Sequence, residues 1–237
     1  MTIHYCQRSG SFPFGDSCRF FYGQTEMAAY TPQIGDIAAC WGNDFQSRFI
    51  TFITGRTCAP RGLKLGPSHV AIIAPYYGES DLYWYESTTR CDRKCLVNRE
   101  FVSGVQMHEI HERAGDYINN NGRVVIYRLN NFESQISGAD LATIQEALIE
   151  DYLLENIRYD MRGALLSGLR VTNRALSLLG VHRKNLFCSD MIASVLMRVE
   201  LIPLDDPDRY TPAGLLRYLI NEGVYHRHLE ITEETTI

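Results

Sequence analysis

Five segments between residues 34 and 129 carry the alternating or short continuous apolar pattern that is typical of β-strands. Several are rich in the β-branched and aromatic residues that favour pleated surfaces, and turn-forming glycine, proline or asparagine separates many of them. The pattern therefore predicts strands at residues 35–41, 68–74, 81–88, 104–108 and 122–129.

The pattern becomes helical after residue 139. Leu141, Ile144, Leu148 and Tyr152 recur at the three- and four-residue spacing of an amphipathic helix, and a leucine-rich stretch at 165–179 continues the helical part. Further helices are predicted at 45–53, from Cys188 onward, and from Thr211-Pro212 to near Gly223, followed by a last strand at 224–231.

Strands followed by helices and one late strand predict an α+β fold with a mainly antiparallel sheet packed against helices. The chain of 237 residues is of the size of one domain, and no linker or repeat divides it. We therefore expect a single domain over 1–237, with an irregular N-terminal arm at 1–33 and a core at 34–231.

Charge and apolar content narrow the class of function. The net charge of −5 and the pI near 5.8 give no electrostatic case for nucleic-acid binding. No apolar run is long enough to span a bilayer, and the first residues lack the apolar core of a secretory signal, so we expect a cytoplasmic protein. The seven cysteines are irregularly spaced, which favours reduced thiols over a disulfide framework.

One cysteine, Cys188, lies at a position that favours the reactivity of its thiol. Cys188 opens the predicted helix whose apolar face carries Met191, Ile192, Val195 and Leu196. Unpaired N–H groups and the helix dipole at such a position favour thiolate, the nucleophilic form of the side chain. The alternative is a small buried apolar residue, which is the usual role of an isolated cysteine.

A thiol nucleophile needs a base, and the base needs a group that orients it. His69 begins an apolar strand after a glycine- and proline-rich loop, and Glu86 lies on the next predicted strand among apolar residues. We therefore predict Cys188, His69 and Glu86 as a catalytic triad, with the backbone N–H groups of Cys188 and Ser189 forming part of an oxyanion hole. Each residue also has a plain structural explanation when considered alone.

The order of four segments resembles the permuted branch of the NlpC-type papain-fold superfamily, in which the histidine strand precedes the cysteine helix. The resemblance covers about Ile34 to Leu219 and is carried chiefly by Gly35-Asp36-Ile37, Ser68-His69-Val70-Ala71-Ile72, Tyr85-Glu86-Ser87 and Phe187-Cys188-Ser189-Asp190-Met191. It implies a papain-like fold and Cys-His-polar chemistry on amides, esters or thioesters, with no cofactor. It also implies that Asp36, Tyr159 and Asp160 shape or line the substrate cleft.

Two classes of function remain open at this point. The first is a cysteine hydrolase of the amidase or peptidase type, or a related acyltransferase, acting on a peptide or acyl-lipid substrate through an acyl-enzyme. The second is a non-catalytic structural or binding protein that keeps the fold and docks onto a larger assembly through residues 1–33.

The chain departs from simpler family members in its N-terminal arm, in the charged insertion Arg90-Cys91-Asp92-Arg93-Lys94-Cys95, and in the long connection at 162–184. Within the insertion, Cys91 and Cys95 could in principle bind zinc together with His108 and His111. That spacing lacks a clear second ligand pair, and residues three apart on a strand point to opposite faces, so we expect no metal site. The basic residues Arg56, Arg61 and Lys64 before His69 form either a solvated loop or a contact for an acidic substrate group.

Overall fold

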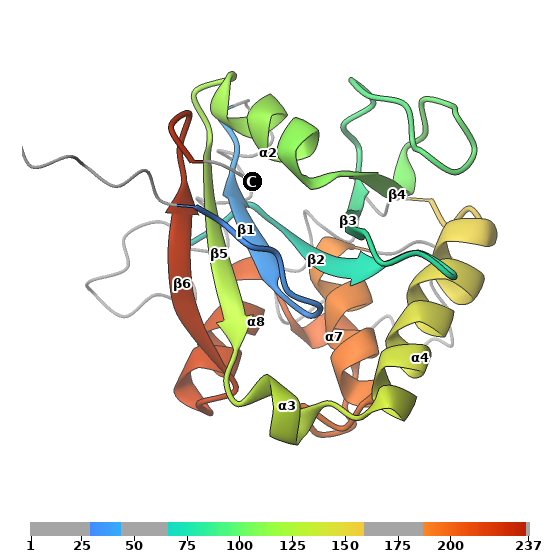
Figure 1. The fold of residues 1–237 in the computed structure, drawn as a ribbon, viewed down its shortest axis with the longest axis vertical. Helices are drawn as coiled ribbons and strands as arrows, with labels where there is room; N and C mark the ends of the chain where they lie inside the picture. The colour runs from blue at the N-terminus through green and yellow to red at the C-terminus, as the bar shows by residue number, and fades with distance from the viewer. Residues whose placement is uncertain (1–28, 44–65, 159–186, 236–237) are drawn as a thin grey trace, which may run out of the picture.

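The computed structural model describes residues 29–43, 66–158 and 187–235, which form an α+β structure around one antiparallel sheet. The strands lie in the order β4-β3-β2-β1-β5-β6, and every neighbouring pair is antiparallel (Figure 1). Their bounds are β1 Ile37–Trp41, β2 His69–Pro75, β3 Leu82–Thr88, β4 Gly104–Glu109, β5 Arg123–Leu129 and β6 Tyr225–Ile231. The predicted α+β class and all six predicted strands are confirmed.

The described helices follow β4 and β5 or lie near the C-terminal end of the chain. Their bounds are α2 Ile110–Ile118, α3 Phe132–Gln135, α4 Gly138–Glu146, α7 Cys188–Arg198 and α8 Pro212–Asn221, with a π-helical turn η1 at Ala147–Leu154 and a 3₁₀ turn η2 at Pro207–Arg209. The predicted helices at 45–53 and 165–179 lie outside the described residues. Among the described residues, no helix combines the length and apolar character needed to cross a bilayer.

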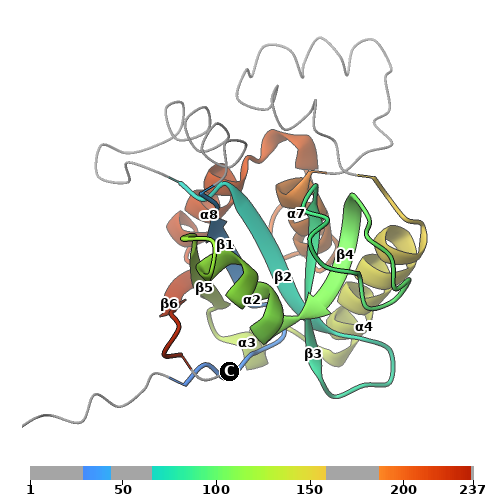
Figure 2. The same ribbon diagram turned by 90° about the horizontal axis from the view of Figure 1, so that it is seen from above.

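Alternating side chains of the strands build two apolar layers, one on each face of the sheet. Val70 and Ile72 of β2 belong to the core shared with α7, α8 and η1. Ala71 and Ile73 point the other way, into a smaller core with Ile110, Ala114 and Tyr117 of α2. Figure 2 shows α2 and α7 on the two sides of β2. The sheet is therefore covered on both faces where β2 and β3 run.

Helix ends follow the local sequence. Thr211 caps α8 by accepting a hydrogen bond from the Gly214 N–H at 3.0 Å, and the chain leaves that helix through Gly223 at φ +68°. The α7 helix begins at Cys188, where the Asp190 carboxylate accepts a hydrogen bond from the N–H of Phe187 at 3.2 Å. Both helix starts agree with the prediction from sequence.

The α2 helix is absent from the sequence-based prediction, which has no element between residues 109 and 121. Ile110, Ala114, Tyr117 and Ile118 nevertheless recur at helical spacing, and they pack on the smaller core. His111, which the sequence analysis treated as a strand residue, lies in this helix. The error followed from extending the strand pattern of residues 104–108 past its end.

Candidate active site

Adjacent strands bring His69 and Glu86 together. In the register of β2 and β3, Ile72 pairs with Tyr85, which places Glu86 opposite Ala71 and one diagonal step from His69. Diagonal neighbours on one face of a sheet are within reach of long side chains. The Nε2 atom of His69 and Oε2 of Glu86 are 2.7 Å apart, a short charge-assisted contact.

Cys188 approaches the same histidine from the opposite layer. It is the first residue of α7, which packs across β2 and β3, and it lies close enough to the His69 ring to influence its pKa. Because Nε2 of His69 is occupied by Glu86, Nδ1 is the nitrogen left for the thiol. The structure thus brings together the three side chains that the sequence nominated, although they come from three different elements.

All three side chains are enclosed. Cys188 and Glu86 are fully buried, and His69 is 7% exposed. Burial by itself lowers the pKa of His69, but the adjacent Cys188 and Glu86 outweigh it and raise that pKa from 6.5 to about 9. The carboxylate of Glu86 therefore favours the imidazolium form of His69.

Glu86 is held in its ionised form. Burial would raise the pKa of its carboxyl group, but the charge of Arg113, followed by that of His69, holds the pKa well below the usual 4.5. The carboxylate accepts hydrogen bonds on both oxygens, with Arg113 on Oε1 and His69 on Oε2. An ionised Glu86 fixes the ring of His69 and supplies the negative charge that an imidazolium needs.

Two residues around this carboxylate, Arg113 and Tyr117, were missed from sequence because both lie on α2. The ring of Tyr117 stacks on His69 with centroids 6.2 Å apart, and its hydroxyl donates to Oε2 of Glu86 at 3.4 Å. The helical spacing of the apolar residues at 110–118 is the signal that would have placed them on a helix facing the sheet.

Ser189 lies beside the nucleophile position. Its hydroxyl donates to the carbonyl oxygen of Tyr210, so the side chain ties α7 to the segment before α8. The first N–H groups of a helix have no acceptor within that helix, and those of Cys188 and Ser189 are the first two of α7. An oxyanion formed at Cys188 would find these donors in place.

Asp36 is not brought together with the triad. It precedes β1 at the end remote from Cys40, the residue that pairs with His69, which corresponds to about 13 Å along the strand. Its two oxygens accept from Arg128 at 2.9 and 2.7 Å, and Oδ2 also accepts from Tyr30 at 2.9 Å. The structure therefore gives Asp36 the role of joining the Tyr30 segment to β5. Tyr159 and Asp160 lie outside the described residues.

Replacing Asp36 with asparagine is expected to lower the free energy of unfolding by about 1–3 kcal/mol, because a buried charged acceptor is lost to Arg128 and Tyr30. Chemical denaturation measures this effect. Cys188 alkylation in the folded protein should keep its wild-type pH dependence; a changed dependence would show that Asp36 contributes to the cleft after all.

The residues considered for zinc do not gather around one point. Cys91 is exposed, whereas Cys95 is buried and accepts a hydrogen bond from the N–H of Met107 at 3.4 Å. His108 is buried and shares a hydrogen bond with Gln106 at 2.8 Å. Within residues 29–43, 66–158 and 187–235, no group of three or more histidine, cysteine, aspartate or glutamate side chains has the arrangement of a metal site.

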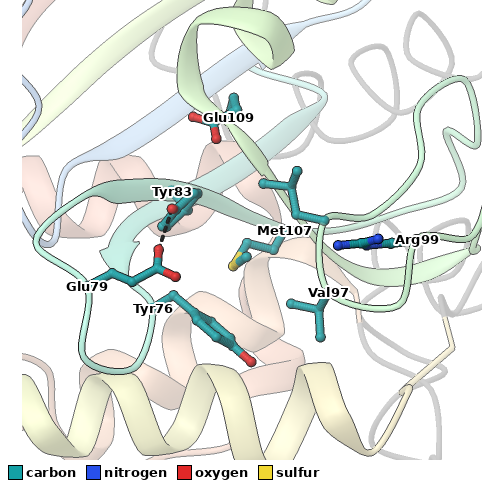
Figure 3. Close-up of a pocket in the computed structure, with 8 residues that line it drawn as sticks. Tyr76, Glu79, Tyr83, Val97, Arg99, Met107 and Glu109 are labelled. Carbon is teal, nitrogen blue, oxygen red and sulfur yellow. Dashed lines mark hydrogen bonds between the residues drawn. The ribbon is translucent and has the colours of Figure 1, made fainter.

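A surface cavity of about 320 Å³ lies at the other end of β3 from Glu86 (Figure 3). Tyr83 donates a hydrogen bond to Glu79 in its wall, as the dashed line in Figure 3 shows. The cavity is lined by Tyr76, Glu79, Tyr83, Leu96, Val97, Arg99, Met107 and Glu109. None of the triad residues contributes to it, so it is separate from the candidate active site.

Comparison with known proteins leaves the family open. No protein-family model matches the chain. No curated protein matches its sequence. A crystal structure of the metalloprotein YiiX from Escherichia coli O157:H7 has 12% sequence identity and a TM-score of 0.49, with 86% of this chain and 99% of that chain covered. The chemistry therefore rests on the side chains of this chain.

Proposed function

We propose that this protein is a cysteine hydrolase of the amidase or peptidase type, with Cys188 as nucleophile, His69 as base and Glu86 as the residue that orients the base. The observation that carries the proposal is the enclosed arrangement itself. One ring nitrogen of His69 contacts an ionised carboxylate at 2.7 Å, and a buried thiol at the start of a helix lies near the same ring.

In the proposed reaction the Cys188 proton passes to His69, which gives a thiolate–imidazolium pair. The sulfur attacks the carbonyl carbon of an amide, ester or thioester, and the π electrons move onto the oxygen. The N–H groups of Cys188 and Ser189 stabilise the resulting oxyanion. When the oxyanion collapses, the bond to the leaving group breaks and His69 donates its proton to that group.

Release of the acyl group uses the same residues in reverse. His69 takes a proton from water as the water oxygen attacks the acyl-enzyme, and the sulfur leaves as thiolate. Another acceptor hydroxyl or amine in place of water would make the protein an acyltransferase. Peptides and acyl lipids both contain the carbonyl group that this chemistry requires. We also infer that the order His69, Glu86, Cys188 reflects a permuted papain-type core.

Iodoacetamide labelling tests this function without a known substrate. Cys188 is expected to react at about pH 6 on the order of 10- to 100-fold faster in the wild type than in His69→Ala, since an isolated thiol is almost fully protonated there. Mass spectrometry of the Cys188 peptide measures the rate. The ratio of rates at about pH 6 and pH 9 within each protein removes differences in access to a buried sulfur.

Two controls are needed to interpret the labelling rates. The exposed Cys91 of the same molecule serves as a reference thiol, and His111→Ala removes a histidine from the outer side of α2. A wild-type Cys188 with the pH dependence of Cys91, unchanged in His69→Ala, would remove the base from the proposal and favour a non-catalytic protein that retains the fold.

A further inference from the structure

The charged insertion at residues 90–95 meets the triad through a single buried arginine. Arg113 on α2 is fully buried, and its Nε lies 2.6 Å from Oε1 of Glu86. Its Nη1 lies 2.7 Å from Oδ1 of Asp92, which is part of the insertion and has a side chain 42% exposed. A continuous chain of polar contacts therefore runs from the surface through Asp92, Arg113 and Glu86 to His69.

The two oxygens of Glu86 have separate partners. Oε1 faces Nε and Nη2 of Arg113, and Oε2 faces Nε2 of His69. A planar guanidinium can cover one oxygen with two of its nitrogens and present the third to another carboxylate, which the single ammonium of lysine cannot do. The ring of Tyr117 lies beside this guanidinium, 5.6 Å from its central carbon.

We propose that Arg113 is a positioning residue for the triad, which keeps Glu86 ionised and turned toward His69, and that Asp92 of the charged insertion holds Arg113 in place. This inference rests on the proposed function. It assigns the charged insertion the role of holding Arg113, and through Arg113 the carboxylate of Glu86, in position beside His69.

The direction of the effect follows from the groups that face Glu86. These are His69 from β2, Arg113 and Tyr117 from α2, His108 from β4 and Cys40 from β1. Burial lowers the pKa of His108, and burial raises the pKa values of Tyr117 and Cys40, so all three are neutral near pH 7. Arg113 is thus the permanent cation in contact with the carboxylate.

Burial raises the pKa of Glu86, and without Arg113 mainly His69 opposes that rise. The carboxyl group of Glu86 then takes up a proton at higher pH. A neutral Glu86 no longer stabilises the imidazolium with which it is in direct contact. The thiolate–imidazolium pair is therefore less stable. Loss of a positive charge alone would favour the imidazolium but would also disfavour the Cys188 thiolate. Arg113→Lys, which keeps the charge, therefore shows whether Arg113 works through its contact with Glu86.

The experiment is the pH dependence of iodoacetamide labelling at Cys188 in full-length variants. In Arg113→Met the midpoint of this pH dependence, which is the pH of half-maximal labelling rate, is expected to rise by about one pH unit or more. Arg113→Lys keeps the positive charge but lacks the planar guanidinium with its several donors, so it should show a smaller upward shift of the midpoint. Asp92→Asn keeps both Arg113 and Glu86 but weakens the contact that holds the guanidinium, so it should also shift the midpoint upward by a smaller amount.

The matched control is Glu112→Gln, which removes an exposed carboxylate of the same helix that contacts Arg93 at 2.6 Å and should leave the midpoint unchanged. Far-UV circular dichroism selects variants that fold. Folded Arg113 variants with a wild-type or lowered midpoint would overturn the inference, and an unshifted Asp92→Asn would remove Asp92 from it. If His69→Ala also leaves labelling unchanged, the proposed function itself fails, which separates the two results.

Discussion

Replacing Cys188 with serine is expected to reduce hydrolysis of p-nitrophenyl acetate to background, a loss on the order of 10⁴- to 10⁶-fold if the probe is turned over at the triad. A serine hydroxyl is far harder to ionise than a thiol, so His69 cannot generate a comparable nucleophile from it. Release of p-nitrophenol measures the rate, and intact-mass spectrometry detects an acetyl group on the wild-type protein.

The control for this variant is Cys91→Ser, because Cys91 is exposed and hydrogen-bonds only to backbone carbonyl oxygens among the described contacts. It should keep the wild-type rate. Equal turnover by wild type and Cys188→Ser, or acetylation mapped to a different cysteine, would contradict the assignment of the nucleophile.

Replacing Glu86 with glutamine is expected to lower the free energy of unfolding by about 3–5 kcal/mol, since Arg113 would remain buried without its main counter-charge. The pKa of His69 should also fall, because the charge of Glu86 helps to raise it to about 9. In the proposed mechanism activity depends on the imidazolium, so the decline of the rate at high pH should begin at a lower pH than in the wild type. Denaturant titration and a pH–rate profile measure the two effects.

A double variant separates stability from catalysis. Glu86→Gln combined with Arg113→Met removes both buried charges, so much of the lost stability should return while the pH–rate profile stays altered. The stabilising effect of Glu86 is present above its ordinary pKa of 4.5 and is lost as the pH falls through its lowered folded pKa. Wild type and Glu86→Gln should therefore converge in stability in strong acid. A double variant no more stable than Glu86→Gln would contradict the buried-charge explanation.

The strands could be predicted from sequence because the pattern of apolar and polar residues within each segment indicates a strand without reference to the rest of the chain. Residues 68–74 and 81–88 read as strands by composition alone, and their adjacency follows from the short turn between them. His69 and Glu86 could therefore be placed side by side before any register was known. Cys188 required a contact across the chain, which only the order of the segments suggested.

The support behind the triad could not be predicted in the same way. Arg113 would read as a surface cation on any isolated helix, and only the packing of α2 on the sheet buries it. Asp92 likewise belongs to an insertion whose cysteines drew attention to metal binding. Asp36, which the resemblance assigns to shaping or lining the cleft, is paired with Arg128 and Tyr30 at the other end of β1.

The order in which the parts occur along the chain has a consequence for synthesis. Five of the six described strands, together with His69, Glu86 and Arg113, are complete by residue 129, whereas Cys188 is added almost 60 residues later. A growing polypeptide thus holds the histidine and its carboxylate before the Cys188 thiol exists. Under the proposed function, acyl chemistry at this site requires α7 to be synthesised and docked, so a chain interrupted upstream of that helix is expected to be inactive.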